Sequence, residues 1–262
     1  LDRLDATANL RNLPFTPNGQ VELLAAGVEL PDRNLERVAL TARARSEEGA
    51  VRADVEQLIL RSGGVAFRSE GARLSRSPDG TLRVEDLRVG SPAGRVEASG
   101  SLAPDGALES RLTVAALDLA RLPRALVPEL GELRGRIDAS ARLMRRAGAT
   151  RGRVELDLTR FALKADRPEL SGHLEGTLRP GRIEAKLSLD GLMKRASARA
   201  LLPAPRDALD GAAWGRAMSS SPVREASVDL AAVDVARLQR FLGLEEHARG
   251  ALGLTAEVRR GG

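Results

Sequence analysis

The chain has 262 residues, of which 42% are hydrophobic and 29% are charged, and this composition is typical of a folded protein rather than a disordered one. It contains no cysteine, which excludes disulfides, thiolate metal sites and cysteine nucleophiles. The net charge is only +5 because 36 acidic residues are interspersed with 41 basic ones, so the surface does not have the character of a nucleic-acid-binding face.

Period-two alternation of aliphatic and polar residues runs through the first half of the chain and predicts short β-strands. The aliphatic positions are Val38, Leu40, Ala42 and Ala44; Val51, Ala53 and Val55; Leu82 and Val84; Leu87 and Val89; and Val96, Ala98, Leu102, Leu108, Leu112, Val114 and Ala116. The parity changes between Val84 and Leu87, which predicts a β-bulge. Asp79-Gly80 and Asp105-Gly106 lie between alternating runs and predict hairpin turns.

The second half shows the same alternation. Its aliphatic and aromatic positions are Val154, Leu156 and Leu158; Phe161, Leu163 and Ala165; Leu170, Leu174 and Leu178; Ile183, Ala185, Leu187 and Leu189; and Ala196, Ala198, Ala200 and Leu202. Strands therefore recur roughly every ten residues, each with one apolar and one charged face. Such a sheet must curl around its apolar face, pair that face with a second sheet, or cover it with a ligand.

Three segments interrupt the strands. Residues 118–130 and 234–242 each favour a short helix, with Asp118 and Asp234 as N-caps and Gly243 as the stop of the second. Residues 202–222 are rich in proline, glycine and serine, and they predict a long loop with a short helix around Trp214. This loop is interpreted either as an ordinary excursion at a repeat junction, which we favour, or as a lid over the mouth of the sheet.

The two capped segments belong to an internal repeat. Residues 115–122 (Ala-Ala-Leu-Asp-Leu-Ala-Arg-Leu) match residues 231–238 (Ala-Ala-Val-Asp-Val-Ala-Arg-Leu), and Arg134-Gly135-Arg136-Ile137 meets Arg249-Gly250-Ala251-Leu252 when one residue is gapped. We expect repeat units at about 112–227 and 228–262, the second incomplete, within one continuous segment over 1–262. A repeat of this kind predicts an extended, stackable architecture.

No motif for catalysis is recognisable. The two histidines are separated in sequence: His173 is expected to face solvent, and His247 has only Glu245 and Glu246 nearby. There is no nucleophile elbow, phosphate loop or dinucleotide fingerprint. We therefore predict that the chain is not an enzyme, has no catalytic residue, and binds no metal and no cofactor. Arg145-Arg146 and Arg259-Arg260 are interpreted as solvated turns or, alternatively, as contacts for acidic lipid head groups.

The segment Leu117–Leu122, its copy at Val233–Leu238 and the strand entry Leu133-Arg134-Gly135-Arg136-Ile137 resemble the AsmA/TamB superfamily of bacterial envelope proteins, part of the bridge-like lipid transfer group. Alternating strands such as residues 94–102 are similar to its β-repeat sections, and the resemblance covers most of the chain. It implies a mostly β fold: an elongated, curled antiparallel sheet with an open, taco-like groove and short capped helices at the repeat junctions.

The resemblance also implies a periplasmic segment for phospholipid transport between the inner and outer membranes. No apolar run approaches the ~18 residues of a membrane span and no signal peptide is visible, so we expect a middle section whose inner-membrane anchor lies outside residues 1–262. The expected partners are phospholipid acyl chains and, as an alternative, outer-membrane assembly proteins that would use the sheet as a scaffold. Nucleic acid is not expected.

The candidate lipid-groove residues are apolar members of the alternating runs: Val114, Ile137, Val154, Leu156, Leu158, Phe161, Leu163, Leu174, Leu187, Leu189, Leu252 and Leu254. The pattern alone leaves open whether these side chains line a groove or a closed core between two sheets.

Overall fold

The computed structural model describes residues 3–11, 18–30, 33–69, 71–123, 132–220, 225–245 and 247–259. The protein is mostly β, as predicted, and its strands pair antiparallel with their neighbours in the chain. The chain divides into two compact units, Leu1–Gly131 and Glu132–Gly262. Among the described residues, no helix is long and apolar enough to cross a lipid bilayer.

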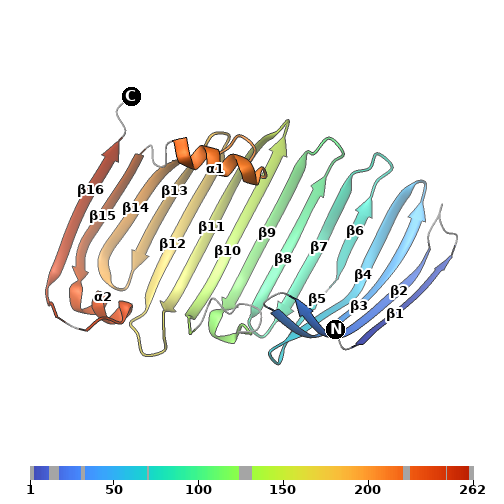
Figure 1. Ribbon diagram of the computed structural model, residues 1–262, viewed down its shortest axis with the longest axis horizontal. Coiled ribbons are helices and arrows are strands. Elements are labelled where there is room, and N and C mark those ends of the chain that lie inside the picture. The colour runs from blue at the N-terminus through green and yellow to red at the C-terminus, as the bar shows by residue number, and fades with distance from the viewer. Residues whose placement is uncertain are drawn as a thin grey trace. The chain divides into compact units, whose positions relative to one another are not determined.

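The strands of the first unit follow one another in space in chain order (Figure 1). They are β1 (Arg3–Arg11), β2 (Asn18–Leu30), β3 (Arg33–Glu47), β4 (Ala50–Ser62), β5 (Val65–Ser69), β6 (Ala72–Arg76), β7 (Leu82–Ser91), β8 (Gly94–Leu102) and β9 (Leu108–Asp118), followed by the 3₁₀ turn η1 (Leu119–Arg121). β5 and β6 both pair with β4 on one side and with β7 on the other, so they form one broken strand.

The second unit also follows chain order. Its strands are β10 (Arg134–Arg146), β11 (Ala149–Ala162), β12 (Leu170–Arg179), β13 (Arg182–Asp190), β14 (Met193–Pro203), β15 (Glu225–Asp234) and β16 (Ala251–Arg259), and its helices are α1 (Gly211–Ser220) and α2 (Val235–Leu242). Figure 1 shows α1 near one end of these strands and α2 near the opposite end.

The turns and the bulge that the sequence predicts in the first unit are confirmed. Gly80 and Gly106 have φ angles of 86° and 79° in the tight turns before β7 and β9, a left-handed conformation that glycine adopts without strain. The register of β7 against β8 shifts between Val84 and Leu87, and Asp86 at the bulge has a φ of 54°. Because the bulge adds one residue to β7, the aliphatic side chains after it point to the same face of the sheet as those before it.

Both predicted caps are confirmed. The Asp118 carboxylate accepts a hydrogen bond from the Ala120 N–H at 3.0 Å, but the ordered turn η1 is only three residues long, and residues 124–130 of the predicted helix lie outside the described residues. The Asp234 carboxylate accepts from the Arg237 N–H at 3.0 Å, and Gly243 ends α2 in the left-handed conformation, as predicted.

The two copies of the sequence motif share further local geometry. The N–H groups of Asp118 and Asp234 donate to the carbonyls of Ala93 and Leu192, both buried residues in hairpin turns. Two residues before each aspartate, Ala116 and Ala232 have positive φ angles of 58° and 51°. The repeated sequence motif thus corresponds to a repeated structure at the end of a strand. An alanine with a positive φ angle is followed by a capping aspartate, whose N–H donates to a neighbouring hairpin turn.

Few apolar side chains are buried, and most of those lie away from the middle of the strands. In the described part of the chain, the buried hydrophobic residues are Ala25, Ala93, Leu119, Ala162, Leu192, Ala196, Ala204, Val233 and Phe241. Most of these positions are in hairpin turns, in helices or at strand ends. Among the described residues, the closely packed positions therefore lie mostly at the ends of the strands, and the central stretches of most strands contain no buried side chain.

We predict that Gly94→Ala destabilises the protein by about 2–4 kcal/mol. Gly94 has a φ of 143°, and a Cβ there would lie 2.7 Å from the Cα of Leu117. Gly253→Ala is the control, because its Cβ would meet nothing closer than the Leu230 carbonyl oxygen at 3.6 Å and its backbone is not left-handed. Urea unfolding measures both variants. Equal losses of stability would contradict the tight docking of the β7–β8 hairpin on β9.

Candidate functional site: the aliphatic face of the second unit

The strand register of the second unit aligns its aliphatic side chains into rows that run across the sheet. Residues directly opposite each other on paired strands point to the same face. The central row contains Ala139, Leu156, Leu174, Leu187, Ala198, Val228 and Ala256, one residue from each strand from β10 to β16. One ungapped row of apolar side chains therefore crosses all seven strands of the unit.

Parallel rows lie on both sides of the central row and on the same face, because their members are two or four residues away from it along each strand. One consists of Ile137, Leu158, Gly172, Leu189, Ala196, Leu230 and Leu254; the next two, on the other side, consist of Ala141, Val154, Gly176, Ala185, Ala200, Ala226 and Val258, and of Leu143, Gly152, Leu178, Ile183 and Leu202. Every member is aliphatic or glycine. We call these four rows the aliphatic face.

The described residues of the second unit do not seal the aliphatic face. Its side chains are half-buried or exposed: Val154 on β11 is 44% exposed, and Ala196, at 3%, is the only buried member of the four rows. Residues in the interior of a sandwich would be covered by an opposing sheet. Among the described residues of this unit, the covering that the face receives comes from neighbouring strands and from segments at the two strand ends.

The first unit has comparable rows. One row crosses β2, β3 and β4 and consists of Leu23, Leu40 and Leu58. Another crosses β7, β8 and β9 and consists of Leu87, Ala98 and Leu112. These six side chains are also half-buried or exposed. The aliphatic pattern is therefore a property of both units.

One end of the aliphatic face is crossed by residues 203–210, which we call the strap. It leaves β14, and the Ala204 N–H donates to the Gly181 carbonyl in the β12–β13 turn. Farther along, the Arg206 carbonyl accepts from the Thr150 N–H at the start of β11. Thr150 and its partner Arg145 have the parity of the aliphatic face, so the strap lies on that face at the strand ends.

The centre of the strap is Asp207. Its carboxylate forms an ion pair with Arg145, with O–N distances of 2.6 Å to Nη2 and 2.9 Å to Nε, and accepts a hydrogen bond from the Thr150 hydroxyl at 3.1 Å. The Thr150 hydroxyl in turn accepts from the Ala208 N–H at 3.0 Å, and Thr150 is fully buried. Hydrogen bonds from the Leu209 N–H, Arg145 and Thr150 hold the pKa of the Asp207 carboxyl below its usual value of 3.8.

The opposite end of the face is covered by α2. A break in the register between Leu158 and Phe161, with Arg160 at a φ of 49°, keeps Phe161 on the aliphatic face. The Phe161 ring lies 6.4 Å from the ring of the buried Phe241 of α2, centroid to centroid. The Arg167 guanidinium, from the β11–β12 loop, donates to the Arg240 carbonyl at 3.0 Å and fixes the helix end. The face is thus bounded by a helix at one end and by the strap at the other.

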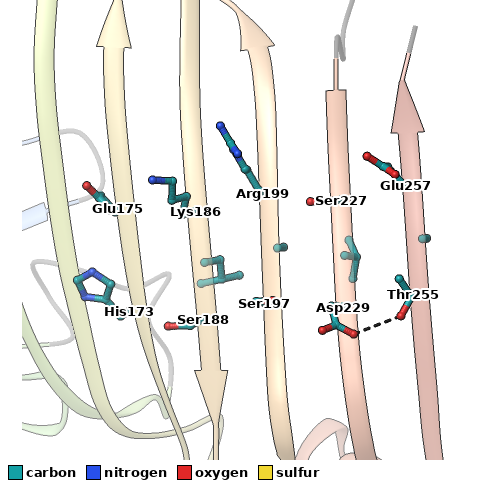
Figure 2. A pocket seen from close by; sticks show the side chains of 14 residues that line it. His173, Glu175, Lys186, Ser188, Ser197, Arg199, Ser227, Asp229, Thr255 and Glu257 are labelled. Atoms are coloured by element: carbon teal, nitrogen blue, oxygen red, sulfur yellow. Dashed lines mark hydrogen bonds between the residues drawn. The ribbon is translucent and has the colours of Figure 1, made fainter.

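The reverse side of the sheet is polar and carries a shallow hollow of about 590 Å³ (Figure 2). Its floor is a row of short polar side chains in register across β12 to β16: His173, Ser188, Ser197, Asp229 and Thr255. The longer charged side chains beside it form ion pairs, such as Arg199 with Glu184 at 2.9 Å. This is the pattern of a solvated face with cross-strand charge pairs.

The predicted solvent exposure of His173 is confirmed, and its Nδ1 lies 2.7 Å from the Asp157 carboxylate. His247 is exposed and lies 3.4 Å from the Glu245 carboxylate. In the part of the chain that the structure describes, no group of three acidic or histidine side chains is placed to hold a metal ion. Arg145 belongs to the strap contact, and the neighbouring Arg146 is exposed at the end of β10.

The structure brings most of the predicted groove residues together. Eight of them belong to the aliphatic face: Ile137, Val154, Leu156, Leu158, Leu174, Leu187, Leu189 and Leu254. Phe161 lies at its α2 end, Leu252 is opposite Val233, and Leu163 follows β11. Val114 belongs to the first unit, opposite Val96.

Other residues of the face were not singled out from the sequence. Ala139, Val228 and Ala256 occupy the central row, and the alternation of their own strands was a sufficient signal to find them. The strap contact had no such signal. Arg145 and Asp207 are 62 residues apart, and an ion pair over that separation produces no periodic pattern in the sequence.

We predict that Leu174→Ala costs about 1–2 kcal/mol of stability, whereas Leu192→Ala costs about 3 kcal/mol. Leu174 is half-buried in the central row and Leu192 is 2% exposed in a hairpin turn, so only the second substitution leaves a full cavity. Chemical denaturation of both variants measures the difference. A loss of 4 kcal/mol or so at Leu174 would instead indicate a sealed core.

We also predict that the strap contributes to stability in a pH-dependent way. Because the folded-state pKa of Asp207 is depressed, its contribution is complete above the unfolded-state pKa of 3.8 and is lost as the pH falls through the lower folded-state value. The difference in urea midpoint between the wild type and Asp207→Asn should therefore be constant at neutral pH and shrink below about pH 3.5. A difference that does not change down to pH 2 would contradict the contact.

Comparison with known proteins does not assign the chain to a family: no family model, curated protein or solved structure matches it. The resemblance to the AsmA/TamB superfamily therefore stays a prediction. The geometry of the aliphatic face is the basis on which a function is proposed.

Proposed function

We propose that the aliphatic face binds the acyl chains of phospholipids and that the protein is a non-enzymatic segment of a hydrophobic conduit between the inner and outer membranes. The observation that carries the proposal is the set of three rows of aliphatic residues and glycine that cross all seven strands, with only one buried member, between the strap and α2. Exposed apolar surface of this extent is unusual on a soluble protein without a ligand or partner.

The dimensions of the face fit this ligand. Between Gly152 and Leu158 on β11 the strand is ~20 Å long, at ~3.4 Å per residue. One leaflet of a bilayer holds acyl chains ~15 Å deep, which is half of its ~30 Å hydrocarbon core. An acyl chain therefore fits on the face in any direction between the two covered ends.

The energetics also fit. Each methylene moved from apolar surroundings to water costs ~0.8 kcal/mol, so a phospholipid with ~30 methylenes needs a continuous apolar surface to move between membranes. The rows contain only aliphatic residues and glycine, which offer no hydrogen-bonding group that would hold a chain at one place. A chain on such a surface is kept out of water yet remains free to slide.

The α2 end offers a place for a head group. A cleft of about 550 Å³ there is lined by three arginines and two aspartates: Arg167, Arg237, Arg240, Asp166 and Asp234. Its excess of guanidinium groups suits the phosphate of a phospholipid. A head group at this cleft would leave its acyl chains beside Phe161 and the aliphatic rows.

The alternative function is a structural scaffold for outer-membrane protein assembly. The aliphatic rows favour this function as well, because a partner protein with an apolar surface could pack on the same face. The scaffold requires no lipid on the aliphatic face, and this difference separates the two functions.

We predict that photo-crosslinking groups at positions 156 and 187 label phospholipid acyl chains at least about tenfold more than groups at 155 and 186, because burying two methylenes is already worth ~1.6 kcal/mol. Leu156 and Leu187 point to the aliphatic face, and their chain neighbours Glu155 and Lys186 are matched controls on the polar face. Mass spectrometry of the crosslinked protein identifies the adducts. Equal labelling of both pairs would overturn the conduit, and labelling by protein alone would favour the scaffold.

A further inference from the structure

The strap places a polar contact on an otherwise aliphatic face. Arg145 and Thr150 continue the parity of Leu143 and Gly152, but instead of apolar neighbours they contact Asp207. Arg145 and Asp207 are 30% and 20% exposed, so this ion pair is better shielded from water than the pairs on the polar face, such as Arg199 with Glu184 at 60% and 31%. A specific, shielded attachment at this end of the strands holds one segment in one position.

What the strap holds in place is α1. The helix begins directly after the strap, where the Asp210 carboxylate caps it by accepting from the Ala213 N–H at 3.1 Å. The indole N–H of Trp214 donates back to the Ala208 carbonyl, so helix and strap are joined. Ala213, Trp214 and Ala217 are half-buried, whereas Gly211, Ala212, Gly215 and Arg216 are exposed.

The helix is a weak element by itself. It has ten residues, below the length at which an isolated helix is stable in water. Gly215 in its interior disfavours the helix further, because glycine has a lower helix propensity than alanine. The position of α1 therefore depends on the strap contact, and short segments of this kind are the ones that open without global unfolding.

We propose that the strap and α1 form a gate at one end of the aliphatic face, that Asp207 holds it shut through Arg145 and Thr150, and that acyl chains enter and leave the face where the gate opens. The ligand in this proposal rests on the proposed function, but the opening of the gate does not. Residues 203–210 bond to Gly181 and Thr150 at the strand ends, so their release opens the end of the face next to the row that contains Leu178, Ile183 and Leu202.

The first experiment follows the gate itself. Trp214 is the only tryptophan of the chain, so intrinsic fluorescence reports on α1 alone. In Asp207→Asn and Thr150→Val, we expect the acrylamide quenching constant of Trp214 to rise about twofold or more, while far-ultraviolet circular dichroism keeps its β-sheet signal. Glu175→Gln, which removes a 2.8 Å ion pair to Arg153 on the polar face, is the matched control and should leave the quenching unchanged.

The second experiment measures entry of a ligand. Stopped-flow mixing with a dansyl-labelled fatty acid should show uptake that is several-fold faster in Asp207→Asn than in the wild type or Glu175→Gln. Because the chain has no cysteine, a Thr150→Cys, Ala208→Cys variant supplies a reversible lock between residues already joined by a 3.0 Å hydrogen bond. Uptake of the fatty acid should slow when this variant is oxidised and recover when a reductant is added. This variant tests the gate even if Asp207→Asn does not fold.

The outcomes separate the two proposals. Faster uptake in the released variant and slower uptake in the oxidised lock support the gate. Binding of the fatty acid at the same rate in released, locked and wild-type proteins overturns the gate and leaves acyl-chain binding intact, since the strap is then a static brace. If no form of the protein binds the fatty acid, the proposed function fails and the gate for acyl chains fails with it.

Discussion

Cross-strand register is the constraint on which the rest of the structure depends. Side chains alternate between the two faces of a strand, so a slip of one residue would move a whole strand's aliphatic set to the opposite face. In the second unit the register holds Leu156, Leu174 and Leu187 opposite one another, and the rows on either side follow automatically. Where a strand needs an extra residue, as at Arg160, a bulge with a positive φ angle absorbs it and keeps the next apolar side chain on the correct face.

In the described part of the chain, few residues are fully buried, and the register determines how the others are covered. The packed side chains are concentrated in turns, helices and strand ends, where Leu192 and Phe241 lie, and the aliphatic rows are covered mainly by one another. On the polar side, charged side chains of neighbouring strands form ion pairs such as Arg153 with Glu175. The aliphatic rows on the opposite side of the sheet contain no charged side chain.

The strands and their faces were predictable from the sequence because both follow from the local alternation of apolar and polar residues. The hairpin turns at Gly80 and Gly106, the bulge before Leu87 and the cap at Asp234 follow from residues within a few positions of one another. The same pattern was sufficient to find eight residues of the aliphatic face. It also extends to β2, where Leu23 lies opposite Leu40, although the sequence analysis did not single out that strand.

The contacts that hold the covering segments on the aliphatic face were not predictable, because they join residues far apart in the chain. Nothing local indicates that Asp207 reaches Arg145, or that Phe241 packs against Phe161. An alternating strand has the same pattern whether its apolar face is open, filled by a second sheet or covered by a ligand. Only the exposure of the side chains in the folded chain distinguishes these cases.

The central claim is that the aliphatic rows hold acyl chains, and native mass spectrometry of the purified chain tests it most directly. The account predicts retained phospholipid on the wild-type protein, and loss of that lipid when Leu174→Asp and Leu187→Asp place two charges in the central row. The paired change Glu175→Gln and Lys186→Gln on the opposite face should leave the lipid in place. A protein that carries no lipid, or that loses it equally with either pair of substitutions, would contradict the claim.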